Sequence, residues 1–241
     1  YSNPLNNPAD AVNWGVTYAN GDLATYGGTD YEASFGYDLV ADPLAVGPIS
    51  LPPGGATKVL RATVNKVVAS NAGLNLYPTN VSFSGDYAVR FNMNIIIDTA
   101  SGTTQGPIFG VNHDGKQTNW WAGSGAIGGP WASDGVWYWI TADGGAGAGD
   151  YILHTGLGGA LPNTGWTRPI AAGLLDNFMN VFKGPPAPYS GYGGPGLVGN
   201  DPPSASGDTR NLTDVEIKQI GTNVSLYLNK IKVLNYYNNT T

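Results

Sequence analysis

The chain has 241 residues, no cysteine and a formal net charge of −6. The lack of cysteine excludes disulfides and any thiolate site for a metal or for catalysis. Eleven scattered lysines and arginines argue against nucleic acid as a partner. No run of about 18 apolar residues exists, so no membrane span is predicted. Charged residues make up 12% of the chain, against about 25% in an ordinary soluble domain. We therefore expect a surface that is easily desolvated against a protein or a sugar.

Residues 1–11 are predicted to form an extended arm, because prolines punctuate a segment with few apolar residues. Beyond it, alternation of apolar and polar residues predicts a series of short strands. In the clearest of them, 87–97, Val89, Phe91, Met93, Ile95 and Ile97 are expected to line a core while Arg90, Asn92 and Asn94 face away. The predicted strands before the last third of the chain are 13–18, 34–40, 59–68, 74–77, 87–97, 107–111, 136–142 and 151–154.

The segment 156–210 interrupts the strand pattern. Apolar residues at helical spacing predict one short helix within 171–182, and Gly184 and Pro185 are placed to end it. The stretch that follows, up to Pro203, is a long Pro/Gly-rich loop. A C-terminal meander then turns at 221–223 and at 229–230. Together these features predict a single all-β domain over 1–241, an antiparallel β-sandwich with a loop and helix insertion.

The run from Phe83 to Met93, FSGDYAVRFNM, resembles the FSGDYxLRFDM strand of a family of bacterial secreted proteins. Segments 107–113, 134–138, 143–151 and 214–217 are similar to that family in the same order. The resemblance implies a concanavalin A-like or laminin-G-like jelly roll and an extracellular or cell-surface location. Such relatives continue into a further core strand, so we expect the arm or a neighbouring subunit to supply it here.

Catalytic groups are scarce. Glu32 and Glu216 are the two glutamates, far apart in sequence, whereas glycoside hydrolysis needs a close pair of carboxylates. His113 and His154 are the two possible bases for serine chemistry, and no Gly-x-Ser-x-Gly elbow accompanies them. We therefore expect a protein that is not an enzyme. Glycoside hydrolysis by a pair of aspartates is a remote alternative.

Calcium is the one cofactor that the sequence allows, because it takes oxygen ligands from loops. The candidate ligands are Asp114, Asp143 and Asp150, which lie in glycine-containing segments. The spacing of these aspartates lacks the density of a self-sufficient calcium loop. The same Asp-Gly and Gly-Gly pairs make good turns without a metal. The favoured interpretation is therefore that they serve only as turns and that the protein has no cofactor, with calcium binding as the alternative.

Tryptophans are concentrated in one third of the chain. Aromatic faces stack on sugar rings, which makes Trp120, Trp121, Trp131 and Trp166 candidate carbohydrate-binding residues. The same residue types are enriched at subunit interfaces. Trp137, together with Trp139, is expected instead to lie in the core.

Five Asn-x-Ser/Thr sequons are potential glycosylation sites in a host that modifies them. Their acceptors are Asn80, Asn211, Asn223, Asn238 and Asn239.

Three functions are compatible with these features. The first is a structural subunit that self-assembles into an extracellular filament, tube or surface layer, as a homo-oligomer or polymer. The second is a lectin-like adhesion module that binds a glycan. The third, remote one is a glycoside hydrolase. The low charge, the long loop and the expected missing strand favour the first.

Overall fold

The computed structural model describes residues 2–20, 31–41, 51, 54–64, 72–93, 107–112, 135–140, 151–156, 213–228 and 230–237. Within these ranges the backbone forms strands and one short 3-10 helix. The elements are η1 (Pro8–Asn13), β1 (Trp14–Asn20), β2 (Tyr31–Asp38), β3 (Lys58–Val64), β4 (Ala72–Pro78), β5 (Tyr87–Met93), β6 (Ile108–Val111), β7 (Gly135–Ile140), β8 (Tyr151–Gly156), β9 (Thr213–Ile220), β10 (Asn223–Leu228) and β11 (Ile231–Tyr237). Each predicted strand overlaps an observed one.

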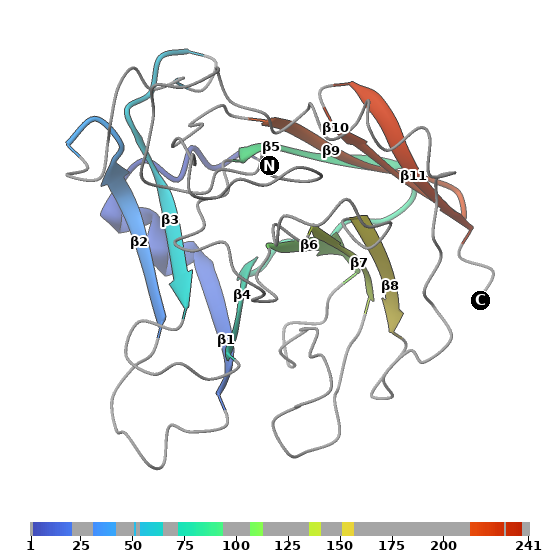
Figure 1. Ribbon diagram of the computed structural model, residues 1–241, viewed down its shortest axis with the longest axis horizontal. Helices are drawn as coiled ribbons and strands as arrows, with labels where there is room; N and C mark the ends of the chain where they lie inside the picture. Colours follow the sequence, from blue (N-terminus) through green and yellow to red (C-terminus); the bar gives the residue numbers. More distant parts are fainter. Residues whose placement is uncertain are drawn as a thin grey trace, which may run out of the picture.

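All strand pairs in the described part of the chain are antiparallel. The order β11-β10-β9-β5 makes a four-stranded sheet, and β6-β7-β8 make a three-stranded sheet. β1 pairs with β4, and β2 pairs with β3. Figure 1 shows the four-stranded sheet lying over the three-stranded one, with the two pairs to one side. The prediction of an all-β, antiparallel protein is confirmed.

Strand β5 has the alternation that the sequence predicts. It pairs with β9 so that Val89 lies opposite Ile217 and Phe91 opposite Val215. Val89, Phe91 and Met93 pack against the core, whereas the residues between them are exposed. Ile95 and Ile97, which were assigned to the same face, lie outside the described residues.

One hydrophobic core joins the four-stranded and three-stranded sheets. Phe91 of β5 meets Phe109 of β6 edge to face, with ring centroids 5.7 Å apart. Each fully buried aliphatic side chain contributes about 1.5–3 kcal/mol, so this shared core holds the two sheets together. Its buried members are Val111, Val136 and Tyr138 from the three-stranded sheet, and Val215, Ile217, Val224, Leu226 and Leu228 from the four-stranded sheet.

Strand β7 is buried on both faces. Tyr138 points into the shared core and is fully buried. Trp137 points the other way along the strand and is 3% exposed, so the prediction that Trp137 is a core residue is confirmed. The side chain of Trp139 lies outside the described part of the chain.

The N-terminal arm is held by its own chain. Its extended part ends at Asn7, which caps η1 with a reciprocal capping box to Asp10. The backbone oxygen of Leu5 accepts a hydrogen bond from the N–H of Gly36, at 3.2 Å. Gly36 lies in an irregularity of β2 at a φ of +72°, a conformation that glycine adopts without strain. Intrachain contacts thus give the arm a defined position on β2.

Other predictions fall beyond the described ranges. The helix expected within 171–182 and the Pro/Gly-rich loop both lie outside them, as does nearly all of the insertion 156–210. In the ranges that are described, no helix is long and apolar enough to cross a membrane.

Candidate ligand-binding surface

The FSGDY segment makes a tight connection between β5 and the β9–β10 hairpin. Gly85 has a φ of +72°, which lets the chain turn just before β5. The next residue, Asp86, accepts a hydrogen bond from the backbone N–H of Gly221 at 2.7 Å. Gly221 lies in the turn between β9 and β10. The connection therefore fixes Phe83 and Tyr87, on either side of it, relative to that hairpin.

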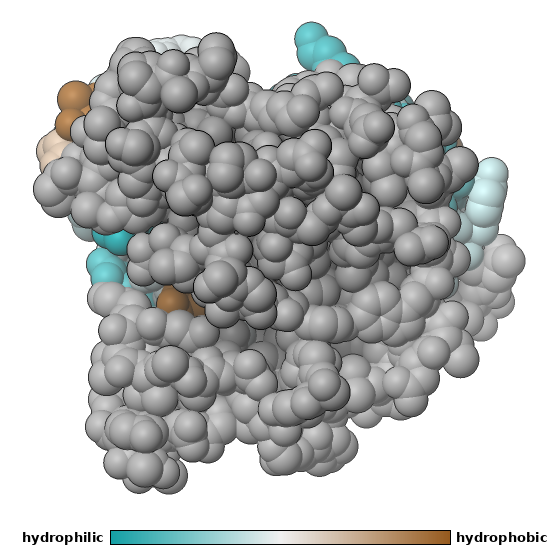
Figure 2. Space-filling view, viewed as in Figure 1, coloured by the Kyte–Doolittle hydropathy of each residue, from teal (hydrophilic) through white to brown (hydrophobic). Residues whose placement is uncertain are grey.

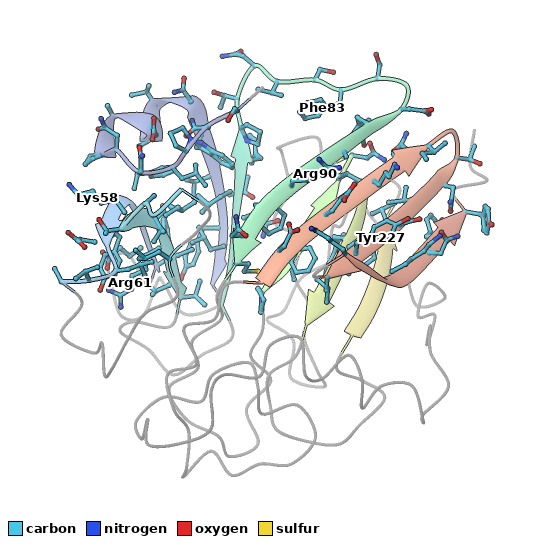
Figure 3. All side chains as sticks on the ribbon, turned by 90° about the horizontal axis from the view of Figure 1, so that it is seen from above. Lys58, Arg61, Phe83, Arg90 and Tyr227 are labelled. Atoms are coloured by element: carbon cyan, nitrogen blue, oxygen red, sulfur yellow. The ribbon has the colours of Figure 1, made fainter. Side chains whose placement is uncertain are left out.

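Phe83 and Tyr87 form a stacked aromatic pair. Their ring centroids are 5.3 Å apart and the ring planes differ by 23°. Phe83 is 47% exposed, whereas Tyr87 is half-buried against the core. Figure 3 shows Phe83 near the segment that leads into β5. The pair thus presents an exposed ring on a fixed support.

Two amide side chains border this pair. The Tyr87 hydroxyl lies 2.9 Å from Asn112 Oδ1 and 3.1 Å from Gln219 Oε1, and can donate to either. Asn112 Nδ2 in turn donates to Gln219 Oε1 at 3.3 Å. Gln219 comes into place because it lies opposite Tyr87 in the β5–β9 register. Asn112 follows β6 and has a φ of +64°, which asparagine tolerates better than most residues.

We call this group of Phe83, Tyr87, Asn112 and Gln219 the Phe83 ledge. It combines an exposed aromatic face with hydrogen-bonding groups and contains no ionisable carboxylate or amine. Burial raises the pKa of Tyr87 above its usual value, so its hydroxyl keeps its proton at neutral pH. The ledge therefore has the chemistry of a contact site for a neutral polar molecule.

The outer face of the four-stranded sheet is a separate, polar surface. Arg90 Nη2 and Glu216 Oε1 lie 3.1 Å apart in an ion pair across β5 and β9. The hydrogen bond to Glu216 is the main reason that the pKa of Arg90 is raised. Tyr227 lies opposite Glu216 in the register of β9 and β10, and Figure 3 shows Arg90 and Tyr227 on this face.

This face brings two carboxylates onto one side of a strand. Asp214 and Glu216 are two residues apart in β9, so their side chains lie on the same, outer face of the sheet. Glu216 is engaged by Arg90, and the pair lies among polar neighbours. Asp214 adds a second negative charge near the Arg90–Glu216 ion pair on this sheet surface.

Exposed apolar side chains occur at one end of the same outer face. Ile220, at the end of β9, lies opposite Asn223, and Asn223 lies opposite Tyr237 of β11. Ile220 is 51% exposed and Tyr237 is 64% exposed. We call Ile220, Asn223 and Tyr237 the sheet-end row. Val40, which follows β2, is also 58% exposed. Figure 2 shows hydrophobic atoms at one edge of the face that it draws.

Most candidate residues from the sequence fall outside the described ranges. These are the proposed sugar-binding residues Trp120, Trp121, Trp131 and Trp166, the proposed calcium ligands Asp114, Asp143 and Asp150, and the sequon acceptors Asn211, Asn238 and Asn239. Within the described ranges, no three histidine or carboxylate side chains come together as a metal would require.

The two described sequons have different surroundings. Asn80 is exposed in a turn after β4, and Ser82 of its sequon is also exposed. Asn223 lies in β10, and its Oδ1 atom is buried. Ser225 of that sequon is 4% exposed and donates a hydrogen bond to Asn235. Asn80 is thus the more accessible acceptor of the two.

Sequence reasoning did not find the Phe83 ledge. Phe83 precedes the alternating strand, so its position in the FSGDY run gave no sign that its ring is exposed. Asn112 and Gln219 are 107 residues apart in sequence, and no local pattern connects them. The pairing of β5 with β9 places Gln219 opposite Tyr87, and the packing of the three-stranded sheet against the four-stranded sheet brings Asn112 to them.

Comparison with known families, with curated proteins and with solved structures finds no significant match to this chain.

Proposed function

We propose that this chain is a non-catalytic, extracellular structural protein whose copies associate through the sheet-end row. The observation that carries the proposal is the exposure of Ile220 and Tyr237, which are 51% and 64% exposed on one register row. The two side chains lie on either side of Asn223 on one face of the sheet, and exposed apolar surface of this kind favours burial against another protein surface.

The energetics of such a contact are favourable. Complete burial of a large apolar side chain contributes about 1.5–3 kcal/mol, and few charged groups have to be desolvated in a chain with 12% charged residues. At the other end of β11, Lys230 in the preceding turn and Lys232 in the strand are both exposed. Lysines of this kind discourage pairing along a strand edge, so contact through the Tyr237 end is favoured.

The N-terminal arm is the weaker candidate for an intersubunit contact. It already bonds to Gly36 and packs on β2 of its own chain. Tyr237, at the end of β11, belongs to the sheet-end row itself. We propose that the row contacts a different surface of the next copy, because such a contact generates a filament or tube where the rotation between copies does not close into a ring.

A jelly-roll sandwich is the fold that we assign to the assembling subunit. The shared core between the four-stranded and three-stranded sheets supports it. The resemblance of the FSGDY strand to secreted proteins supports an extracellular location. The alternative function is a lectin-like adhesion module, which the exposed ring of Phe83 favours.

The test is to image the purified protein by negative-stain electron microscopy and to measure its mass by analytical ultracentrifugation. The wild type is expected to form polymers, and Tyr237→Lys and Ile220→Lys are expected to remain monomeric. The matched control is Val12→Lys, which alters a side chain that is 82% exposed on η1 and should polymerise normally. A wild type that is monomeric at high concentration contradicts the proposal.

A further inference from the structure

The Phe83 ledge has an aromatic face that is already oriented for a ligand. The Phe83 ring rests on Tyr87 at 5.3 Å, and 47% of Phe83 is exposed. A ring that is fixed before binding loses little rotational freedom when a ligand covers it. An aromatic face is complementary to the C–H face of a pyranose ring.

The amides beside the ring supply the polar half of a sugar site. Each side-chain amide carries two N–H donors. The hydrogen bonds within the ledge use one donor of Asn112 and none of Gln219. The remaining donors lie next to the aromatic pair, where sugar hydroxyl groups can accept from them. The shared bonds to Tyr87 hold both amides in position.

The charges at and around the Phe83 ledge favour a neutral ligand over an anionic one. The ledge itself has no cationic side chain to bind a phosphate, sulfate or sugar acid. The adjacent carboxylate of Asp86 accepts from Gly221 and disfavours an anion. The net charge of the chain, −6, also disfavours an anionic ligand.

From these observations we infer that the Phe83 ledge is a binding site for a neutral hexose or pentose unit of a polysaccharide. The ring stacks on the sugar, and Asn112 and Gln219 donate to its hydroxyl groups. The site does not depend on the tryptophans at 120, 121, 131 and 166. It is also independent of the sheet-end row, because the ledge lies on the core side of β5 and the row lies on the outer face.

The experiment is a titration of the protein with cellohexaose, maltohexaose and xylohexaose. Binding is measured by isothermal titration calorimetry and by chemical shift changes in NMR spectra. At least one of these neutral oligosaccharides is expected to bind with a Kd of about 1 mM or below. Phe83→Ala should weaken that binding about tenfold, which corresponds to the loss of one aromatic contact. Phe83→Trp should retain or strengthen it.

The matched control is Tyr237→Ala, which removes another exposed aromatic ring, 64% exposed, from the opposite face of the sheet. It is expected to leave the Kd unchanged even if it abolishes polymers. Three outcomes overturn the inference: no binding of any of the three oligosaccharides, equal binding by wild type and Phe83→Ala, or stronger binding of the anionic polysaccharide heparin through the same residues. Loss of polymers in Tyr237→Lys bears on self-association alone.

Discussion

The carboxylate of Asp86 accepts a 2.7 Å hydrogen bond from the backbone N–H of Gly221. The two residues are 135 positions apart in sequence. The hydrogen bond therefore joins the residue before β5 to the turn between β9 and β10. It also sets the position of Phe83 and Tyr87 relative to Gln219, and it therefore connects the stability of the sheet with the geometry of the ledge.

Replacing Asp86 by alanine should lower the free energy of unfolding by about 1 kcal/mol, because the N–H of Gly221 loses its protein acceptor. Asp86→Asn keeps an acceptor oxygen and should lose less than half as much. Urea unfolding at pH 7 measures both values. Equal stability of Asp86→Ala and the wild type would show that water replaces the carboxylate without cost.

The shared core should respond strongly to cavities. Leu226 is fully buried between the two sheets, so Leu226→Ala is expected to cost about 2–5 kcal/mol in the free energy of unfolding. Ile220→Ala is the matched control on the neighbouring strand. Ile220 is 51% exposed, and its truncation should cost less than about 1 kcal/mol. Chemical denaturation at pH 7 distinguishes the two, and similar losses would contradict the assigned core.

Tyr138 should make stability depend on pH in the alkaline range. Burial raises its pKa well above the usual value of 10.0. Above pH 10 the unfolded chain releases this proton while the folded chain keeps it, so the free energy of unfolding falls as the pH rises. Below pH 10 both states hold the proton and this contribution is constant.

Tyr138→Phe removes that contribution. Between pH 10 and pH 11 the free energy of unfolding of this variant should fall less steeply than that of the wild type. Urea unfolding at each pH measures both values. The hydroxyl is buried without a partner among the described residues, so the variant should be no less stable than the wild type at pH 7. An unchanged slope would mean that Tyr138 titrates normally in the folded protein.

Gly36 and Gly85 allow backbone strain to be separated from steric conflict. Both have a φ of +72°, so an alanine at either position costs about 1 kcal/mol in backbone strain. A Cβ at residue 85 meets nothing within 4 Å, whereas one at residue 36 would lie 2.7 Å from Pro8 Cδ. Gly36→Ala should therefore be the more destabilising. It should also make residues 2–7 more sensitive to limited proteolysis, and equal behaviour of the two variants would exclude a contact with the arm.

The described sequons should differ in occupancy when the chain is secreted by a eukaryotic host. We expect a glycan at Asn80, whose sequon is exposed, and none at Asn223, whose Ser225 is bonded to Asn235. Peptide mass spectrometry of the secreted protein gives both occupancies. Asn80→Gln should remove that glycan, and secreted protein modified at Asn223 would contradict the assigned placement of β10.

The sequence by itself determined the strands and the class of the fold. Alternation of apolar and polar side chains is a local property, because successive residues of a strand face opposite ways. Val89 and Phe91 therefore face the core as predicted, while Arg90 faces outward. Turn residues likewise marked the hairpin at Gly221, since the conformation of a turn depends on a few neighbours in sequence.

Only the tertiary structure decided which strands pair and which side chains meet. Ile220 lies on the outer face of the sheet, because Val215, Ile217 and Gln219 face inward along β9, opposite Phe91, Val89 and Tyr87. The Phe83 ledge draws on the segment before β5, the residue after β6 and the end of β9. Contacts across such separations depend on strand register and on the packing of one sheet on another, and neither is encoded in the pattern of any single segment.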